Sequence, residues 1–217
     1  MVSKMVRITA VLGDYYHPEG WSRESLVEAL KTIEDLQINY CNYEQLEDEL
    51  SNQPDAVILF KENRLNPNEE IVDHWLTEEL SLKINRYVSN GGGWLAWHSG
   101  LASYSPESAY TQMLKGYFLH HPEKHQMVQY KSVPGNGINI NSSFEVLDEH
   151  YFVHCDEEST EVFLLSESID GHAAAGWSHS FGEGRVCCLT PTHNKDGLLN
   201  PDFLSLLGNC VNWTISK

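Results

Sequence analysis

The chain has 217 residues, and its 31 acidic against 14 basic side chains give a formal net charge of −17 at pH 7. The length is typical of one α/β domain, and the negative charge argues against nucleic acid and anionic membrane surfaces as partners. Five cysteines without a Cys-x-x-Cys pair indicate no disulfide framework, and no apolar run is long enough to span a membrane. We therefore expect a single cytoplasmic domain over residues 1–217, without a signal peptide.

The first half of the chain alternates strand and helix patterns. Short apolar runs bounded by turn residues predict strands, and periodic apolar residues behind Ser22 or Thr77 predict capped helices. In chain order, strands are expected at 6–12, 38–41, 56–60 and 94–97, with helices at 22–36, 43–50 and 77–90 between them. This alternation predicts a parallel sheet with right-handed crossovers.

The second half has a different pattern. After a short helix at 108–115, strands are expected at 126–130, 144–147, 162–165, 173–178 and 186–189. Gly182-Glu183-Gly184 is typical of a hairpin turn between the last two strands, and Asn200 before Pro201 predicts the cap of a final helix. A parallel half is therefore followed by a more antiparallel half folded back onto it.

The strand at 94–97 carries the clearest chemical signal. It follows three glycines and ends on His98, which Ser99 and Gly100 follow. Open α/β sheets bind ligands at the carboxyl edge, and many hydrolases hold their nucleophile on a tight strand-to-helix elbow there. A histidine at that position can move protons or bind a metal. His98 is the first candidate, with a histidine tucked under a loop as the alternative.

Several segments, taken in their order and spacing, resemble the ThuA-like (trehalose utilisation) family. They are GGGWLAWHS at 91–99, LKGYFLHHP at 114–122, DEHY at 148–151, AAAGWSHSFGEGRV at 173–186 and LTPTH at 189–193. The resemblance implies a flavodoxin-like, class I glutamine amidotransferase-like fold. That fold has three α/β/α layers, a mostly parallel central sheet and antiparallel additions in the C-terminal half. The resemblance also implies a role in the metabolism of trehalose or a related disaccharide, because members of the family are associated with oxidoreductases that make 3-keto sugars.

The elbow residue excludes one activity of the related fold. A glutamine amidotransferase needs a cysteine there, because its thiolate attacks the amide. His98 occupies this position, and Cys187 and Cys188 lie inside a predicted strand. We therefore do not expect glutaminase activity.

Three further residues join His98 as catalytic candidates. His121 precedes a proline, which restricts it to an extended conformation and fixes its direction. Glu149 belongs to a segment whose acidic pair and tyrosine are characteristic of the family that the chain resembles. His193 lies past the strand at 186–189, on the rim of His98 if the two strands are neighbours. Each also has a plain structural interpretation as a loop or turn residue.

Two chemistries suit this set. Three imidazoles and a carboxylate fit zinc or another divalent metal, with one position open to water, and the candidate ligands are His98, His121 and His193. No local signature such as His-Glu-x-x-His supports a metal. In the metal-free alternative, His98 and Glu149 act as acid and base, while His121 and His193 orient a substrate hydroxyl or carbonyl.

Aromatic residues suit a sugar substrate, because their faces pack on the C–H faces of sugar rings. The candidate substrate-binding residues are His17, Tyr104, Tyr117, Tyr151 and Trp177. Core packing is the alternative for every strand aromatic. If residues 148–151 are extended, Asp148 and His150 point to one side, and Glu149 and Tyr151 to the other.

The resemblance implies an enzyme of carbohydrate metabolism, and the imidazole and carboxylate candidates suit a hydrolase or isomerase acting on a sugar or keto-sugar. A ketone acidifies the neighbouring C–H, so a base can start an elimination that expels the glycosidic oxygen. The alternative is a non-catalytic sugar-binding or regulatory module, and a metal-dependent hydrolase of a non-sugar substrate stays open. The expected partners are a small carbohydrate and a second copy of the chain in a homodimer.

Overall fold

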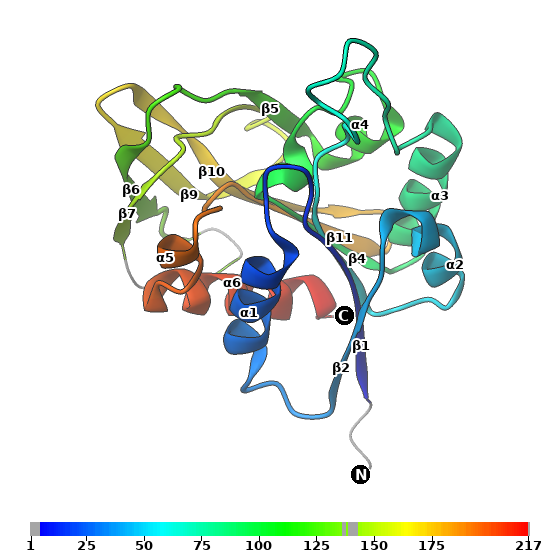
Figure 1. Ribbon diagram of the computed structural model, residues 1–217. Coiled ribbons are helices and arrows are strands. Elements are labelled where there is room, and N and C mark those ends of the chain that lie inside the picture. The colour runs from blue at the N-terminus through cyan, green and yellow to red at the C-terminus, as the bar shows by residue number, and fades with distance from the viewer. Residues whose placement is uncertain (1–4, 136–137, 139–142, 217) are drawn as a thin grey trace.

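The computed structural model describes residues 5–135, 138 and 143–216, and a nine-stranded sheet forms its centre (Figure 1). Across the sheet the strands are β2 (Leu36–Tyr40), β1 (Val6–Leu12), β3 (Ala56–Phe60), β4 (Gly93–Trp97), β11 (Gly184–Leu189), β10 (Gly171–Phe181), β9 (Glu161–Ser168), β6 (Gln126–Ser132) and β7 (Phe144–Asp148). The first five pair in parallel and the others antiparallel. The parallel strands follow the flavodoxin-like order 2-1-3-4-5, with β11 in fifth place. The predicted fold class is confirmed.

Helices cover both faces of the sheet (Figure 1). One layer holds α1 (Glu19–Leu30), α5 (Lys195–Leu198) and α6 (Pro201–Ile215), and the other holds α2 (Leu46–Ser51), α3 (Glu78–Ser89) and α4 (Ala109–Leu114). Short 3-10 helices span Tyr43–Gln45 and His98–Leu101 (η2). Trp97 belongs to the core under α1 and α6, whereas Trp94 belongs to the core under α3 and α4. The two tryptophans therefore face opposite ways, as the alternation of a strand predicts.

Several local predictions are confirmed. Thr77 caps α3 by accepting a hydrogen bond from the amide of Leu80, and Asn200 caps α6. Phe181 pairs with Gly184 across a two-residue turn, in which Gly182 has a φ of 60°. The helix caps and the hairpin turn could be predicted from the sequence because each depends on only a few neighbouring residues.

Other local predictions were wrong. Ser22 lies inside α1, where its hydroxyl donates to the carbonyl of Glu19, and the preceding Pro18 takes the cap position. The helix ends at Leu30, and Leu36 already belongs to β2. The predicted helix was too long because apolar residues in the turn after Leu30 and in the following strand happen to continue the helical spacing of the leucines.

Three short elements were not predicted. The strands β5 (Gly116–His120) and β8 (Phe152–Cys155) form a separate two-stranded antiparallel sheet, and α5 is a four-residue helix. Their sequences are too short to show a period, and only pairing across the fold makes the two strands recognisable.

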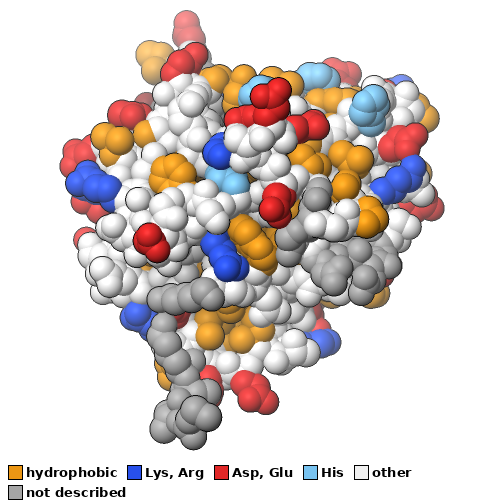
Figure 2. Space-filling view, turned by 180° about the vertical axis from the view of Figure 1, so that it is seen from behind, with side chains coloured by type: hydrophobic (Ala, Val, Ile, Leu, Met, Phe, Trp, Pro, Cys, Tyr) orange, Lys and Arg blue, Asp and Glu red, His pale blue; other side chains and the backbone are white. Residues whose placement is uncertain are grey.

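In the part of the chain that the structure describes, no helix is long and apolar enough to cross a membrane. Figure 2 shows the face opposite to that of Figure 1, where Lys and Arg side chains are scattered among acidic and neutral ones. The excess of acidic residues is therefore spread over this face and forms no single patch.

We expect Gly100→Ala to destabilise the protein strongly. A Cβ at this position would lie 2.3 Å from the carbonyl oxygen of Leu59 in β3, so η2 would have to move away from the sheet. Overpacking of this kind costs about 1–3 kcal/mol of unfolding free energy, which urea denaturation measures. Gly20→Ala is the matched control, because nothing lies within 4 Å of its Cβ. Equal stabilities of the two variants would contradict the close approach of η2 and β3.

We also expect His179 to make stability depend on pH. Burial lowers its pKa from 6.5 to about 4, and its Nε2 donates to the carbonyl of Met113 at 2.9 Å. Between these two values the unfolded chain binds a proton that the folded chain does not, so stability falls as pH falls from 6.5 to about 4. The slope reaches about 1.4 kcal/mol per pH unit. Denaturation at several pH values should give a flatter profile for His179→Gln, and an unchanged slope would refute this assignment.

Candidate functional site

The carboxyl ends of the parallel strands bring chemically active side chains to one edge of the sheet. His17 follows β1, Glu62 follows β3, His98 follows β4 and His193 follows β11. Glu149 joins them from the end of β7. A cavity of about 430 Å³ opens there, lined among others by Tyr16, His17, Glu62, Arg64, Ser103, Phe118, His121, Glu149, Tyr151 and His193. Doubly wound sheets hold ligands at this edge, near the point where the strand order reverses.

His98 forms the predicted elbow. It follows β4 directly and has a left-handed φ of 47°, a conformation that is uncommon for non-glycine residues and that histidine adopts more often than most. Its Nδ1 donates to the carbonyl of Thr190 at 2.6 Å, and its Nε2 is buried without a hydrogen-bond partner. Burial lowers the pKa of the His98 imidazole, so the ring is neutral at pH 7.

His17 is held in a similar way. Its Nδ1 lies 2.6 Å from a carboxylate oxygen of Asp14, which leaves Nε2 for another partner. Burial alone would raise the pKa of Asp14, but the hydrogen bond and charge of His17 hold it at about 2. The ring centres of His17 and His98 are 5.2 Å apart. Two anchored imidazoles therefore lie side by side at the inner end of the site.

Glu149 lies between the imidazoles. One carboxylate oxygen is 3.7 Å from Nε2 of His98 and 3.9 Å from Nδ1 of His193, and the other is 3.7 Å from Nε2 of His121. Burial raises the pKa of Glu149, but the surrounding imidazoles of His98, His193 and His121 outweigh burial and hold the pKa at about 2. Glu149 is therefore ionised and central to the cluster.

His193 is paired with a second buried carboxylate. Its Nδ1 contacts Asp148, which also accepts from the hydroxyl of Thr192 and from the amide of His193. Burial lowers the pKa of His193, but the hydrogen bond and charge of Asp148 and the charge of Glu149 raise it above its ordinary value. The raised pKa therefore favours the protonated form of the His193 imidazole.

The expected alternation over residues 148–151 fails. β7 ends at Asp148, so Asp148 and Glu149 both reach His193 although alternation puts them on opposite sides. His150 points instead to the hydroxyls of Ser166 and Ser168 in β9. The chain turns at this point, and strand periodicity no longer applies.

His121 lies at the mouth of the cavity, with its side chain 36% exposed. Its Nδ1 donates to the carbonyl of Pro122 at 2.8 Å, and its Nε2 lies 3.7 Å from a carboxylate oxygen of Glu149. His120 turns away and stacks on Phe152, with ring centres 4.9 Å apart. The two neighbouring histidines therefore have different surroundings, as the following proline predicts.

The donor set fits a divalent metal ion. Ligand atoms of His17, His98 and Glu149 lie within 4.8 Å of one another, and so do those of His125, Glu149 and His193. The buried, unpartnered Nε2 of His98 supports the first set. Metal-binding histidines usually donate their other ring nitrogen to a carboxylate or carbonyl, as His17 and His98 do here. The first set thus differs from the predicted ligands, because His17 and Glu149 replace His121 and His193.

The predicted substrate-binding residues divide. His17 and Tyr151 line the cavity, and the Tyr151 ring stacks on His98 at 4.0 Å between centres. Tyr104 and Trp177 are instead buried in the core and donate to the carbonyls of Lys61 and Leu114. Tyr117 lines a different hollow and stacks on His154.

Sequence reasoning missed Glu62 and Arg64, which line the same cavity as Glu149 and His121. A signal was present, because both follow the buried strand at 56–60 and the carboxyl-edge rule that identified His98 applies to them equally. Of the thiols, Cys187, Cys188 and Cys210 are buried in the core, whereas Cys41 and Cys155 are partly exposed.

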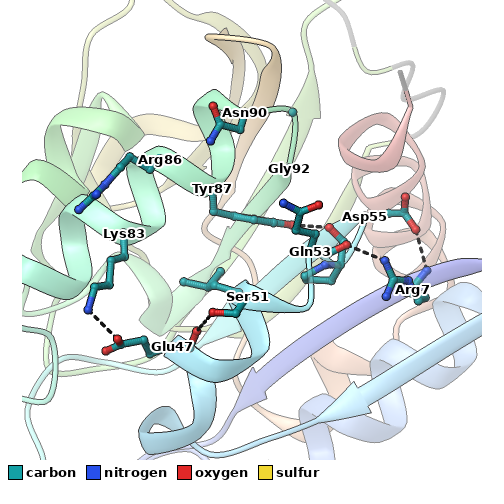
Figure 3. A pocket seen from close by; sticks show the side chains of 13 residues that line it. Arg7, Glu47, Ser51, Gln53, Asp55, Lys83, Arg86, Tyr87, Asn90 and Gly92 are labelled. Atoms are coloured by element: carbon teal, nitrogen blue, oxygen red, sulfur yellow. Dashed lines mark hydrogen bonds and ion pairs between the residues drawn. The ribbon is translucent and has the colours of Figure 1, made fainter.

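A hollow of about 520 Å³ lies at the opposite, amino edge of the parallel strands. Figure 3 shows Arg7 directed at Gln53 and Lys83 directed at Glu47. Arg7 also donates to the carbonyl of Asn52, and Tyr87 donates to that of Pro54. These polar groups already have partners within the chain, so the hollow offers little to a ligand.

The fold recurs in solved structures. A ThuA-like protein from Parabacteroides merdae superposes with a TM-score of 0.76 at 12% identity, over 98% of this chain and 91% of that one. Cytoplasmic protein STM1381 from Salmonella typhimurium LT2 gives 0.67 at 16% identity, over 98% of this chain and 100% of that one. A β-galactosidase from Rahnella sp. R3 gives 0.65 at 12% identity, over 97% of this chain and 32% of that one.

A comparison with curated protein sequences finds no match. The family model ThuA, described as trehalose utilisation, matches residues 14–214, which is nearly the whole chain. On this match, and with the fold that the solved ThuA-like structure shares, the protein belongs to the ThuA family.

Proposed function

We propose that this protein is a cytoplasmic enzyme that cleaves a keto-disaccharide by metal-assisted elimination. The observation that carries the proposal is the convergence of His17, His98 and Glu149, with both imidazoles anchored through Nδ1 and Nε2 left for a ligand. Trehalose utilisation, the description of the family, supplies the substrate class.

His17, His98 and Glu149 would hold the divalent ion. An ion bound there polarises a sugar carbonyl as a Lewis acid, which makes the neighbouring C–H more acidic. The neutral state of His98 and the ionised state of Glu149 are the forms that ligate a metal. Asp14 and the carbonyl of Thr190 fix the direction of the two rings.

The remaining imidazoles move protons. His121, whose Nδ1 donates to the carbonyl of Pro122, acts through Nε2 as the base that takes the proton from the carbon between the ketone and the anomeric carbon. The electron pair of that C–H bond forms a carbon–carbon double bond, and the anomeric carbon–oxygen bond breaks. His193, whose raised pKa favours the protonated ring, delivers its proton to the departing glycosidic oxygen.

We expect untagged protein to contain about one divalent ion per chain by elemental mass spectrometry. His98→Ala and Glu149→Gln should each lose most of it, because each removes a ligand. His120→Ala should keep it, since that ring stacks on Phe152 outside the cluster. Wild-type protein that stays metal-free after incubation with zinc and dialysis would rule out the metal.

We expect the wild-type protein to turn over a 3-keto-disaccharide, measured by release of the leaving sugar. His121→Ala should lower kcat by about 10²–10⁴-fold, the usual contribution of a general base. His120→Ala is the control and should keep the wild-type rate. Saturable sugar binding without any product from the wild-type protein would instead favour a binding or regulatory module.

A further inference from the structure

We propose that Glu62 and Arg64 form a subsite for two neighbouring hydroxyls of an uncharged sugar ring, and that this subsite rejects phosphorylated sugars. The inference rests on the proposed function, because it describes how the same cavity holds the part of the substrate that does not react. It concerns residues that follow β3 and line the same cavity as Glu149.

Glu62 is a buried carboxylate with one oxygen in use. The residue is 2% exposed. Its Oε2 accepts from Nε of Arg64 at 2.7 Å and from the hydroxyl of Ser103 at 2.9 Å. Its Oε1 is buried without a partner, although the residue lines the cavity. An unsatisfied buried acceptor is costly, so Oε1 calls for a donor that a ligand brings.

The backbone around Glu62 is held rigidly. Its amide donates to Asp14 at 3.0 Å, and its carbonyl accepts from the indole of Trp75 at 2.9 Å. Ser103, which orients the carboxylate, has a left-handed φ of 66°. Backbone strain of this kind is retained where the surrounding structure imposes it, often at ligand sites.

Asp14 connects this subsite to the reacting end of the cavity. One of its oxygens contacts Nδ1 of His17 and the other accepts from the amide of Glu62. The buried carboxylate of Asp14 therefore holds both the imidazole of His17 and the backbone of Glu62 in place. In the proposed complex, Asp14 thereby fixes the distance between the reacting carbon of the sugar and the hydroxyls bound at Glu62 and Arg64.

The charges at the subsite favour a neutral ligand. In the proposed subsite, Oε1 of Glu62 accepts a hydrogen bond from one sugar hydroxyl. The guanidinium of Arg64, 36% exposed, donates to the oxygen of the neighbouring sugar hydroxyl. The ring of Tyr16 lies 5.9 Å from that guanidinium and offers a flat wall for a sugar. Because Arg64 is already paired with Glu62, a phosphate at this subsite meets a carboxylate together with the guanidinium.

The test is titration calorimetry with trehalose, methyl α-glucoside and trehalose 6-phosphate. None of the three carries a ketone, so binding is measured without the proposed elimination. Wild-type protein should bind trehalose at least about 10-fold more tightly than its 6-phosphate.

Glu62→Gln should remove this preference. Arg64 and Ser103 both donate to the position that Oε2 of Glu62 occupies. The oxygen of the glutamine side chain should therefore take that position, which leaves its NH₂ group at the position of Oε1, facing the ligand. We expect about 10-fold weaker trehalose binding, because the acceptor becomes a donor. Binding of the 6-phosphate should improve relative to trehalose, since the carboxylate charge is gone.

Two further variants keep the test decisive. Arg64→Lys keeps a positive charge beside the buried carboxylate of Glu62 and should weaken trehalose binding by removing the planar donors of the guanidinium. Glu145→Gln removes the same charge from an exposed site on β7 and should change nothing.

The proposal is overturned if wild-type protein binds neither neutral sugar, or binds the 6-phosphate more tightly, or if Glu62→Gln matches the Glu145→Gln control. Metal content and keto-sugar turnover, measured on the same wild-type sample, are separate readouts. A metal-loaded, active protein without the sugar preference would refute the subsite and leave the proposed function standing. Sugar selectivity without turnover would do the reverse.

Discussion

Carboxylates buried or half-buried at one edge of the sheet constrain the groups around them. Asp14, Asp148 and Glu149 each lose hydration, and such a loss is unfavourable unless hydrogen bonds and opposite charge replace it. Asp14 pairs with His17, Asp148 pairs with His193, and Glu149 lies among three imidazoles. The carboxylates therefore orient His17 and His193, while the carbonyl of Thr190 orients His98. Ring nitrogens of His17 and His98 converge near Glu149.

The order of the strands determines which side chains meet. β11 is last in the chain but enters the sheet beside β4, which brings His193 next to His98. The elbow at His98 needs the small Gly100 behind it, because η2 passes close to β3. The antiparallel half then adds Glu149, so that parallel and antiparallel halves each supply part of the site.

Two groups of residues that line the cavity have different chemistry. One group consists of imidazoles and an ionised carboxylate, suited to a metal and to proton transfer. In the other, Glu62 and Arg64 form an ion pair while Oε1 of Glu62 stays without a partner. Asp14 contacts a member of each group, His17 and Glu62.

The sequence by itself determined the α/β class, most strands of the parallel half, the elbow at His98 and the rim position of His193, because these follow from apolar runs and from residues at strand ends. Only the tertiary structure decided which aromatic residues line the cavity. Tyr104 and Trp177 are residue types that are common in sugar sites, but their hydroxyl and indole groups donate to backbone carbonyls in the core. The tertiary structure also paired β5 with β8, grouped His17 with His98, and exposed the unmet acceptor of Glu62. Convergence of this kind depends on contacts between residues far apart in the chain, which local periodicity does not encode.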